Sequence, residues 1–253
     1  MSGKKIVVTR PSSRMRDAVR IIEEHDGVAV VVPTLELELV NSSSLKDLIG
    51  RLSELEWLIF TSVSSLDSIF LFYPDFLERL GDGCRVAVIG HKTAEVCERY
   101  GLGVDLVPRD YTAEGLLESF EGMDVGGLNI GIPRTFSARA VLPEGLERMG
   151  ANVFLAESYH SVLPKDTSGI ERLVDDIMCG GVDAITFTSP LTVHNLFKVA
   201  GDDVGLRDAL NDSVVVVCIG PITFKALEEY GVESFYPSVY TVRDMLELLF
   251  DRL

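Results

Sequence analysis

The sequence predicts an α/β protein made of two similar doubly wound domains, each organised around a parallel sheet. Short runs of β-branched residues alternate with segments of helical periodicity along the whole chain of 253 residues, and this rhythm is typical of parallel sheets covered by helices. Several short motifs recur after about 130 residues, which indicates an internal duplication. Hydrophobic residues make up 47% of the chain and charged residues 25%, as in a folded globular protein.

The expected strands are short segments that are apolar on both faces, as strands of a helix-covered parallel sheet must be. In chain order they are residues 5–9, 28–32, 56–60, 85–89, 128–132, 152–155, 183–187 and 214–219. Helical spacing of apolar residues marks segments 13–24, 93–100, 138–149 and 224–230. Each of these helices is expected to end on a glycine in the left-handed conformation, namely Gly27, Gly101, Gly150 and Gly231.

The duplication is visible in three pairs of motifs that occur in the same order. Phe-Thr-Ser at 60–62 recurs at 187–189, Ile-Gly-x-x-Thr at 89–93 recurs at 219–223, and Pro-x-x-Tyr-Thr at 108–112 recurs at 237–241. The separations are 127, 130 and 129 residues. A weaker parallel relates Thr9-Arg10-Pro11 to Pro133-Arg134-Thr135. Chance matches would not keep both order and spacing, so the chain contains two repeats, near 1–124 and 125–253.

Charge and hydropathy exclude several classes of function. The net charge of −16 argues against a nucleic-acid partner, because binding a phosphate backbone needs a basic surface. No apolar run reaches the roughly 18 residues that cross a bilayer, and the apolar stretch after the first five residues is too short for a signal peptide. We therefore expect a cytoplasmic protein that does not associate with membranes.

The usual signatures of metal sites and of common enzymes are missing from the sequence. The four cysteines have no C-x-x-C spacing and the four histidines form no H-x-x-x-H pair, so we expect reduced thiols and no metal site. There is no glycine-rich phosphate loop, no G-x-G-x-x-G after a strand, no G-x-S-x-G and no H-E-x-x-H. The acidic residues fall mostly at surface helical spacing, and no carboxylate pair stands out as acid and base.

One local arrangement does recur. A strand runs into a turn that contains a small hydroxyl residue or a glycine, and the turn leads directly into a helix. The first repeat has such turns at 9–12, 60–62, 90–93 and 111–112, and the second at 133–135, 188–190, 220–223 and 240–241. The free N–H groups and the dipole at a helix start favour an anion, and in open α/β sheets these turns lie where ligands bind. Helix capping alone explains any single turn, but the matched set favours a ligand with several carboxylates or phosphates.

Tyr159 is the other residue that stands out, because it lies near the middle of the chain among polar neighbours, between Ser158 and His160. Taken alone, it is explained equally well as a strand or linker tyrosine with a partly buried ring.

In this order, the elements resemble the uroporphyrinogen-III synthase family of the tetrapyrrole pathway, and the resemblance covers nearly the whole chain. It rests on Thr9-Arg10-Pro11 after the first strand, the paired Phe-Thr-Ser, Ile-Gly-x-x-Thr and Tyr-Thr motifs, and the central Tyr159. The segments at 187–190 and 219–223 are closest to the family pattern, whereas His91 and Lys92 are not characteristic of it.

The resemblance implies domains that differ from the two repeats. One domain would contain residues 1–35 and 165–253, and the other residues 38–162. The segments 32–37 and 157–162 would form a two-stranded β connection between them, and this connection would act as a hinge.

The resemblance also implies the chemistry. The protein would be a lyase of heme biosynthesis that cyclises hydroxymethylbilane to uroporphyrinogen III, with loss of water and inversion of ring D, in a cleft between the domains. It would act as a monomer without metal or cofactor. Tyr159 would be the catalytic proton donor. The substrate carboxylates would be bound at Thr9, Arg10, Ser62, Thr93, Ser189 and Thr223.

Two other classes of protein stay open at this point. A non-enzymatic two-domain binder of a small polyanion would have the same turns, although such receptors usually carry a signal peptide. A different α/β enzyme, such as a transferase that uses a nucleotide, would be expected to have the glycine-rich phosphate loop that is missing here.

Overall fold

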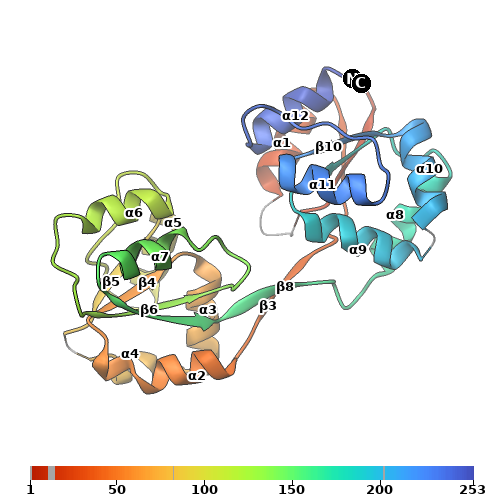
Figure 1. Ribbon diagram of the computed structural model, residues 1–253. Coiled ribbons are helices and arrows are strands. Elements are labelled where there is room, and N and C mark those ends of the chain that lie inside the picture. The colour runs from red at the N-terminus through yellow and green to blue at the C-terminus, as the bar shows by residue number, and fades with distance from the viewer. Residues whose placement is uncertain (1, 11–14, 82, 202) are drawn as a thin grey trace. The chain divides into compact units, whose positions relative to one another are not determined.

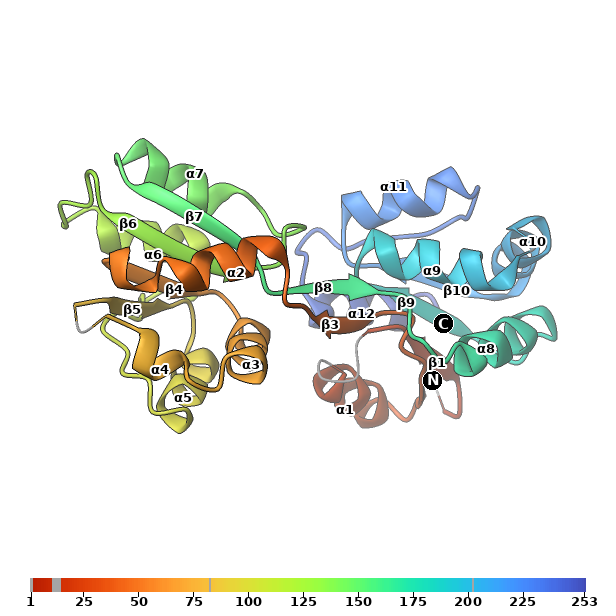
Figure 2. The same cartoon turned by 90° about the horizontal axis from the view of Figure 1, so that it is seen from below.

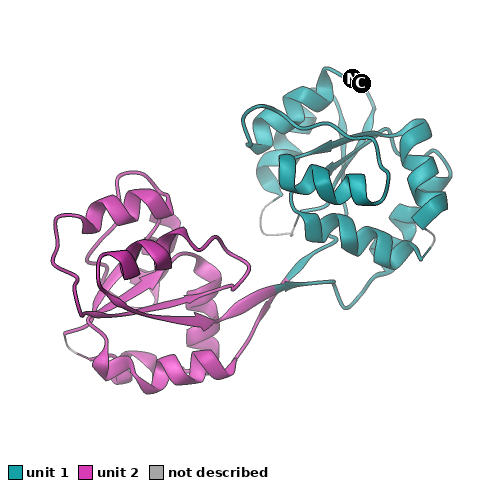
Figure 3. Ribbon diagram, viewed as in Figure 1, with its two compact units in different colours: residues 1–36, 161–253 teal, residues 37–160 magenta. Residues whose placement is uncertain are grey.

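The computed structural model describes residues 2–10, 15–81, 83–201 and 203–253. They fall into two units, which are shown in Figure 3: unit 1 contains residues 1–36 and 161–253, and unit 2 contains residues 37–160. The chain crosses between the units twice, at 36–37 and at 160–161. That each unit is a domain able to fold by itself remains a prediction.

Unit 1 is built on a parallel sheet with the strand order β10-β9-β1-β2 (Figure 1). The first strand–helix–strand comprises β1 (Lys5–Val8), α1 (Arg16–Glu24) and β2 (Val28–Val31). The other elements of the unit come from the end of the chain: α8 (Ser168–Met178), β9 (Ala184–Phe187), α9 (Pro190–Ala200), α10 (Asp203–Ser213), β10 (Val215–Cys218), α11 (Pro221–Glu229) and α12 (Val242–Phe250).

Unit 2 has a parallel sheet of the same kind, with the order β5-β4-β6-β7. Its elements are α2 (Ser43–Gly50), a 3₁₀ turn (Leu52–Glu54), β4 (Trp57–Phe60), α3 (Val63–Phe72), α4 (Phe76–Arg79), β5 (Arg85–Val88), α5 (His91–Arg99), α6 (Ala113–Phe120), β6 (Asn129–Arg134), α7 (Val141–Arg148) and β7 (Asn152–Glu157). The two chain crossings pair as a two-stranded sheet, β3 (Glu36–Leu39) with β8 (Tyr159–Val162).

The two sheets are superimposable in topology, which confirms the duplication. In unit 1, β9 and β10 hold the places that β4 and β5 hold in unit 2, and β1 and β2 hold those of β6 and β7. Each unit therefore combines the opening strand–helix–strand of one repeat with the remaining strands of the other repeat.

Each sheet is covered on both faces because successive residues of a strand point to opposite sides. In β4, Leu58 and Phe60 belong to a core with residues of α2, α3, α4 and α5, whereas Trp57 and Ile59 belong to a core with residues of α6 and α7. Figure 2 shows α7 on one side of this sheet and α3, α4 and α5 on the other. Unit 1 has the same two-sided arrangement, so the predicted doubly wound class is confirmed.

The glycine ends of the helices were predicted correctly at three of four positions. Gly101, Gly150 and Gly231 have φ of 79°, 90° and 73°. The prediction is wrong at Gly27, because Asp26 takes the left-handed conformation there, with φ of 59°. Gly27 is instead required by a close approach, since a Cβ atom would lie 2.9 Å from Cγ2 of Ile22.

One of the eight predicted helix starts is also wrong, and another falls partly on residues that are not described. After the turn at 133–135 the chain forms a loop, and α7 begins only after its N-cap Ala140. After the turn at 9–12, α1 begins after Met15, and Pro11 and Ser12 lie outside the described residues, as do residues 13 and 14 of the expected first helix. No helix among the described residues is long and apolar enough to cross a membrane.

Candidate functional site

Four helices begin directly after a strand and have no side chain bonded to the N–H groups of their first turn. They are α3 and α5 in unit 2 and α9 and α11 in unit 1, at matched positions of the two repeats. The next helix in each unit differs, since Thr112 and Thr241 cap α6 and α12 by accepting from the N–H of Gly115 at 2.9 Å and of Asp244 at 3.1 Å. The uncapped starts are therefore the ones suited to an anionic ligand.

Ser62 and Ser189, both predicted site residues, are the N-caps of α3 and α9. Their backbones are extended, with φ of −157° and −161°, yet neither hydroxyl accepts from the helix as an N-cap serine commonly does. The Ser62 hydroxyl lies 3.3 Å from that of Ser65. The Ser189 hydroxyl is buried and has no hydrogen-bond partner among the described residues. The two serines thus leave their helix starts open.

The three predicted threonines are buried and belong to the framework of the turns. The Thr9 hydroxyl donates to the carbonyl of Thr186 at 2.8 Å and ties β1 to β9. Thr93 and Thr223 lie inside the first turns of α5 and α11, and the N–H of Thr93 donates to the carbonyl of Gly90 at 3.0 Å.

Arg10 follows Thr9 directly. Its side chain is half-buried and interacts with another residue of the protein.

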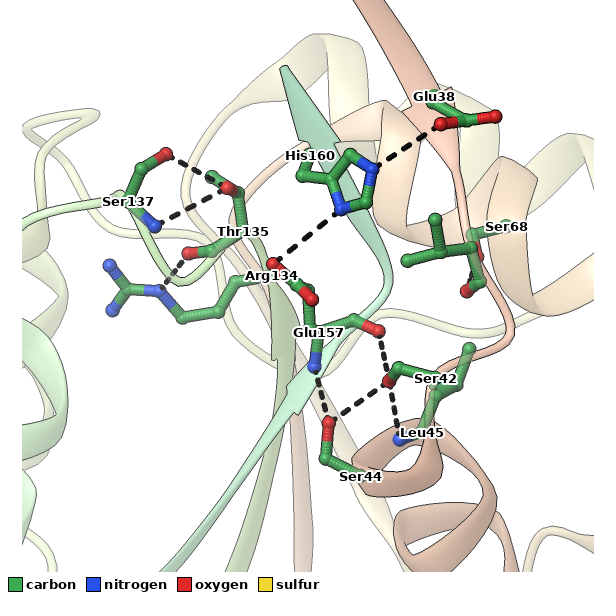
Figure 4. A network of polar contacts seen from close by, with 11 residues as sticks. Glu38, Ser42, Ser44, Leu45, Ser68, Arg134, Thr135, Ser137, Glu157 and His160 are labelled. Atoms are coloured by element: carbon green, nitrogen blue, oxygen red, sulfur yellow. Dashed lines mark hydrogen bonds and ion pairs between the residues drawn. The ribbon is translucent and has the colours of Figure 1, made fainter. Parts of the chain in front are cut away.

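Tyr159 is the first residue of β8, and only 7% of its surface is exposed. The backbone before it is held by side chains from the start of α2, as Figure 4 shows for Glu157: its N–H donates to the Ser44 hydroxyl at 3.0 Å and its carbonyl accepts from the Ser42 hydroxyl at 2.6 Å. The carbonyl of Ser158 accepts from the N–H of Val40 at 3.0 Å. Tyr159 therefore projects from a fixed stretch of backbone, as a precisely placed group requires.

Arg134 is a buried cation beside Tyr159 that was noted in the sequence only as part of a turn. It ends β6 with 4% of its surface exposed, and it donates through Nε to the carbonyl of Thr135 at 3.1 Å and through Nη2 to that of Arg139 at 2.8 Å. Burial lowers the pKa of the guanidinium, and its interaction with the Tyr159 phenol works in the opposite direction. Its place in the repeat, equivalent to Arg10, is the signal that could have identified it.

Surface hollows lie elsewhere: one of about 750 Å³ between α2 and β7, one of about 570 Å³ beside α4 and β5, and one of about 450 Å³ between α8 and β2. None of the three is lined by a predicted site residue. Within the part of the chain that the structure describes, no three His, Cys, Asp or Glu side chains are grouped so as to hold a metal ion.

Comparison with known proteins decides the family. A family model described as "Uroporphyrinogen-III synthase HemD" matches residues 16–247. The chain belongs to the uroporphyrinogen-III synthase family. A relative from Methanothermobacter thermautotrophicus, named "Putative uroporphyrinogen-III synthase", is 48% identical over 244 residues and covers 96% of each chain. The "Uroporphyrinogen-III synthase" of Chlorobaculum parvum is 28% identical over 234 residues, or 91% of each chain. The family therefore places the chain among enzymes of tetrapyrrole and heme biosynthesis.

Solved structures of the uroporphyrinogen-III synthase family agree in fold. The uroporphyrinogen-III synthetase of Helicobacter pylori matches with a TM-score of 0.60 at 14% identity, and the alignment covers all of both chains. A mutant uroporphyrinogen III synthase of Thermus thermophilus matches with a TM-score of 0.54 at 22% identity, covering 99% of this chain and 98% of that one. At these identities the likeness establishes the two-unit α/β fold.

Proposed function

We propose that this protein is an active uroporphyrinogen-III synthase, a lyase that converts hydroxymethylbilane to uroporphyrinogen III with loss of water and inversion of ring D. The observation that carries the proposal is the set of four uncapped helix starts, two in each unit, in a chain of this family. The substrate is a flexible octacarboxylate, and these helix starts are where an α/β fold binds anions.

Binding in this proposal comes from many weak contacts, to which helix starts of both units contribute. One helix start contributes about 0.3–1 kcal/mol at an exposed site, so several must act together to hold the bilane in one folded shape. Backbone N–H groups at Ser62 and Ser189, and in the turns that contain Thr93 and Thr223, bind carboxylates. Thr9 shapes the turn in which Arg10 complements a further carboxylate.

Tyr159 is the catalytic residue in this proposal. Its phenol donates a proton to the terminal hydroxyl of the bilane, which departs as water. The adjoining pyrrole N–H returns a proton to the phenolate, so a neutral azafulvene is left. Ring D is then attacked at its substituted position, and a spiro intermediate rearranges so that the ring is inverted before closure. Arg134 is held in place by the carbonyls of Thr135 and Arg139, so its buried side chain helps to shape the site.

The proposal is tested by incubating the purified protein with hydroxymethylbilane and separating the uroporphyrinogen isomers. Isomer III is expected from the active protein, and isomer I, the product of spontaneous closure, from a heat-inactivated control. We also propose that the protein acts as a cytoplasmic monomer without metal or cofactor, so turnover is expected to survive dialysis against a chelator.

If the protein binds the bilane but yields only isomer I, the proposal is wrong and the chain is a polyanion binder of the same fold. A turnover that returns only when a divalent ion is added would contradict the cofactor-free mechanism.

A further inference from the structure

The repeated Pro-x-x-Tyr-Thr motif has one residue that is largely exposed in both copies. In the copies at 108–112 and 237–241 the proline is buried, so it belongs to the core. The threonine is also structural, since Thr112 and Thr241 are the N-caps of α6 and α12 and each accepts from a first-turn N–H group. The tyrosine between them is neither buried nor a helix cap, although each ring has one aromatic neighbour, His91 for Tyr111 and Tyr236 for Tyr240.

Tyr111 and Tyr240 are exposed over 52% and 58% of their surfaces. Single exposed aromatic residues are common and need no explanation. These two, however, stand at the same place in two repeats that have diverged nearby, where His91 and Lys92 of one repeat replace Pro221 and Ile222 of the other. A large ring kept exposed in both copies indicates a shared contact outside the protein chain.

Both rings lie against the glycine that begins an uncapped helix. A Cβ atom at Gly220, the N-cap of α11, would lie 3.2 Å from Cδ1 of Tyr240, closer than nearly all such contacts. A Cβ atom at Gly90, the N-cap of α5, would lie 3.9 Å from Cβ of Tyr111. The ring of His91 also meets that of Tyr111 edge-on, with centroids 4.8 Å apart. Each unit thus presents one open aromatic face beside one of its helix starts.

We propose that Tyr111 and Tyr240 are specificity-determining residues that each contact one pyrrole ring of the bilane with the open face of the phenol ring. The inference rests on the proposed function, because it takes the substrate from there. Aromatic rings attract one another in offset or edge-to-face arrangements. A pyrrole held in this way has its acetate and propionate groups next to the helix start that binds carboxylates. The tyrosines hold the substrate and take no part in the proton transfer.

Alanine and phenylalanine variants of both tyrosines separate a ring contact from a hydroxyl contact. An aromatic pair contributes about 0.5–1.5 kcal/mol, so Tyr111→Ala and Tyr240→Ala are each expected to raise KM for hydroxymethylbilane about 2- to 12-fold. The double variant is expected to combine the two effects, and kcat is expected to change little. Tyr111→Phe and Tyr240→Phe keep the ring face and are expected to stay within about twofold of the wild type.

Val239→Ala is the matched control. Val239 precedes Tyr240 and is 54% exposed, but it is not repeated, because the equivalent position in the other repeat is Asp110. Thermal melts of all variants are expected to match the wild type. If the alanine variants melt lower, Tyr111→Leu and Tyr240→Leu restore bulk without an aromatic face, and their KM must still rise.

The outcomes distinguish this inference from the proposed function. If the wild type forms isomer III but the alanine or leucine variants keep its KM, the inference is wrong and the function stands. The inference is equally wrong if the phenylalanine variants are as impaired as the alanine variants. If the wild type forms no isomer III at all, the proposed function fails, and the inference fails with it.

Discussion

A fragment containing residues 37–160 should fold by itself, whereas a fragment of the same length, residues 1–124, should not. The first fragment keeps every strand of the β5-β4-β6-β7 sheet and both of its cores. The second is one sequence repeat, but it retains only β5 and β4 of that sheet and only β1 and β2 of the other.

The size of the defect in the 1–124 fragment follows from what it leaves out. In unit 2 it lacks four buried residues of β6 and α7: Ile130, Ile132, Leu142 and Leu146. Burying one such side chain contributes about 1.5–3 kcal/mol, so these four account for about 6–12 kcal/mol. A whole domain is stable by only about 5–15 kcal/mol. In addition, β4 loses its neighbour β6 and β1 loses its neighbour β9.

Circular dichroism with thermal melts compares the two fragments directly. We expect helical signal and a cooperative transition for residues 37–160, and no cooperative transition for residues 1–124. A cooperative melt of 1–124, together with an unfolded 37–160 fragment, would refute the reasoning and favour two sequential domains.

Three further predictions concern single side chains. Tyr159→Phe is expected to lower turnover about 10²- to 10⁴-fold with little change in product affinity, and the product should still be isomer III; near-normal turnover would remove Tyr159 from the mechanism. The Lys4 ammonium donates to the Asp183 carboxylate at 2.7 Å and holds the pKa of this carboxyl group below its usual value. The ionised carboxylate therefore stabilises the fold above about pH 3.9, and this contribution is lost as the pH falls further. Asp183→Asn should thus cost about 0.5–1.5 kcal/mol at pH 7 and nothing in strong acid, as pH-dependent melts can show. Burial raises the pKa of the Cys218 thiol to about 11, so in titration with a thiol reagent near pH 8 the exposed Cys179 should react first; fast reaction of Cys218 would contradict this.

The strands could be predicted from the sequence because each is set by its own residues. Segments 56–60 and 183–187 each begin with an acidic residue and continue with mostly apolar ones, and β4 and β9 begin one residue after the start of each predicted range. The repeated turns were also predictable, since Ser62 and Ser189 do begin helices.

Which strands pair could not be deduced from local pattern. Ile6 of β1 lies beside Ala184 of β9, which is in the other repeat, and nothing near either residue specifies the choice. The role of Thr9 was hidden for the same reason, because its hydroxyl bonds to a carbonyl 177 residues away. Arg134 was missed because its burial next to Tyr159 depends on how β6 and β8 are placed, which local sequence does not reveal.

The central claim is that backbone N–H groups at four helix starts, two in each unit, bind the carboxylates of one ligand. Amide NMR of the ¹⁵N-labelled protein tests it most directly, in a titration with uroporphyrinogen III under anaerobic conditions. The account predicts that the largest shift changes fall in the first turns of α3, α5, α9 and α11, at residues 63–65, 91–93, 191–192 and 222–223, since Pro190 and Pro221 carry no N–H group. Changes confined to one unit, or centred on the hollow between α2 and β7, would contradict it.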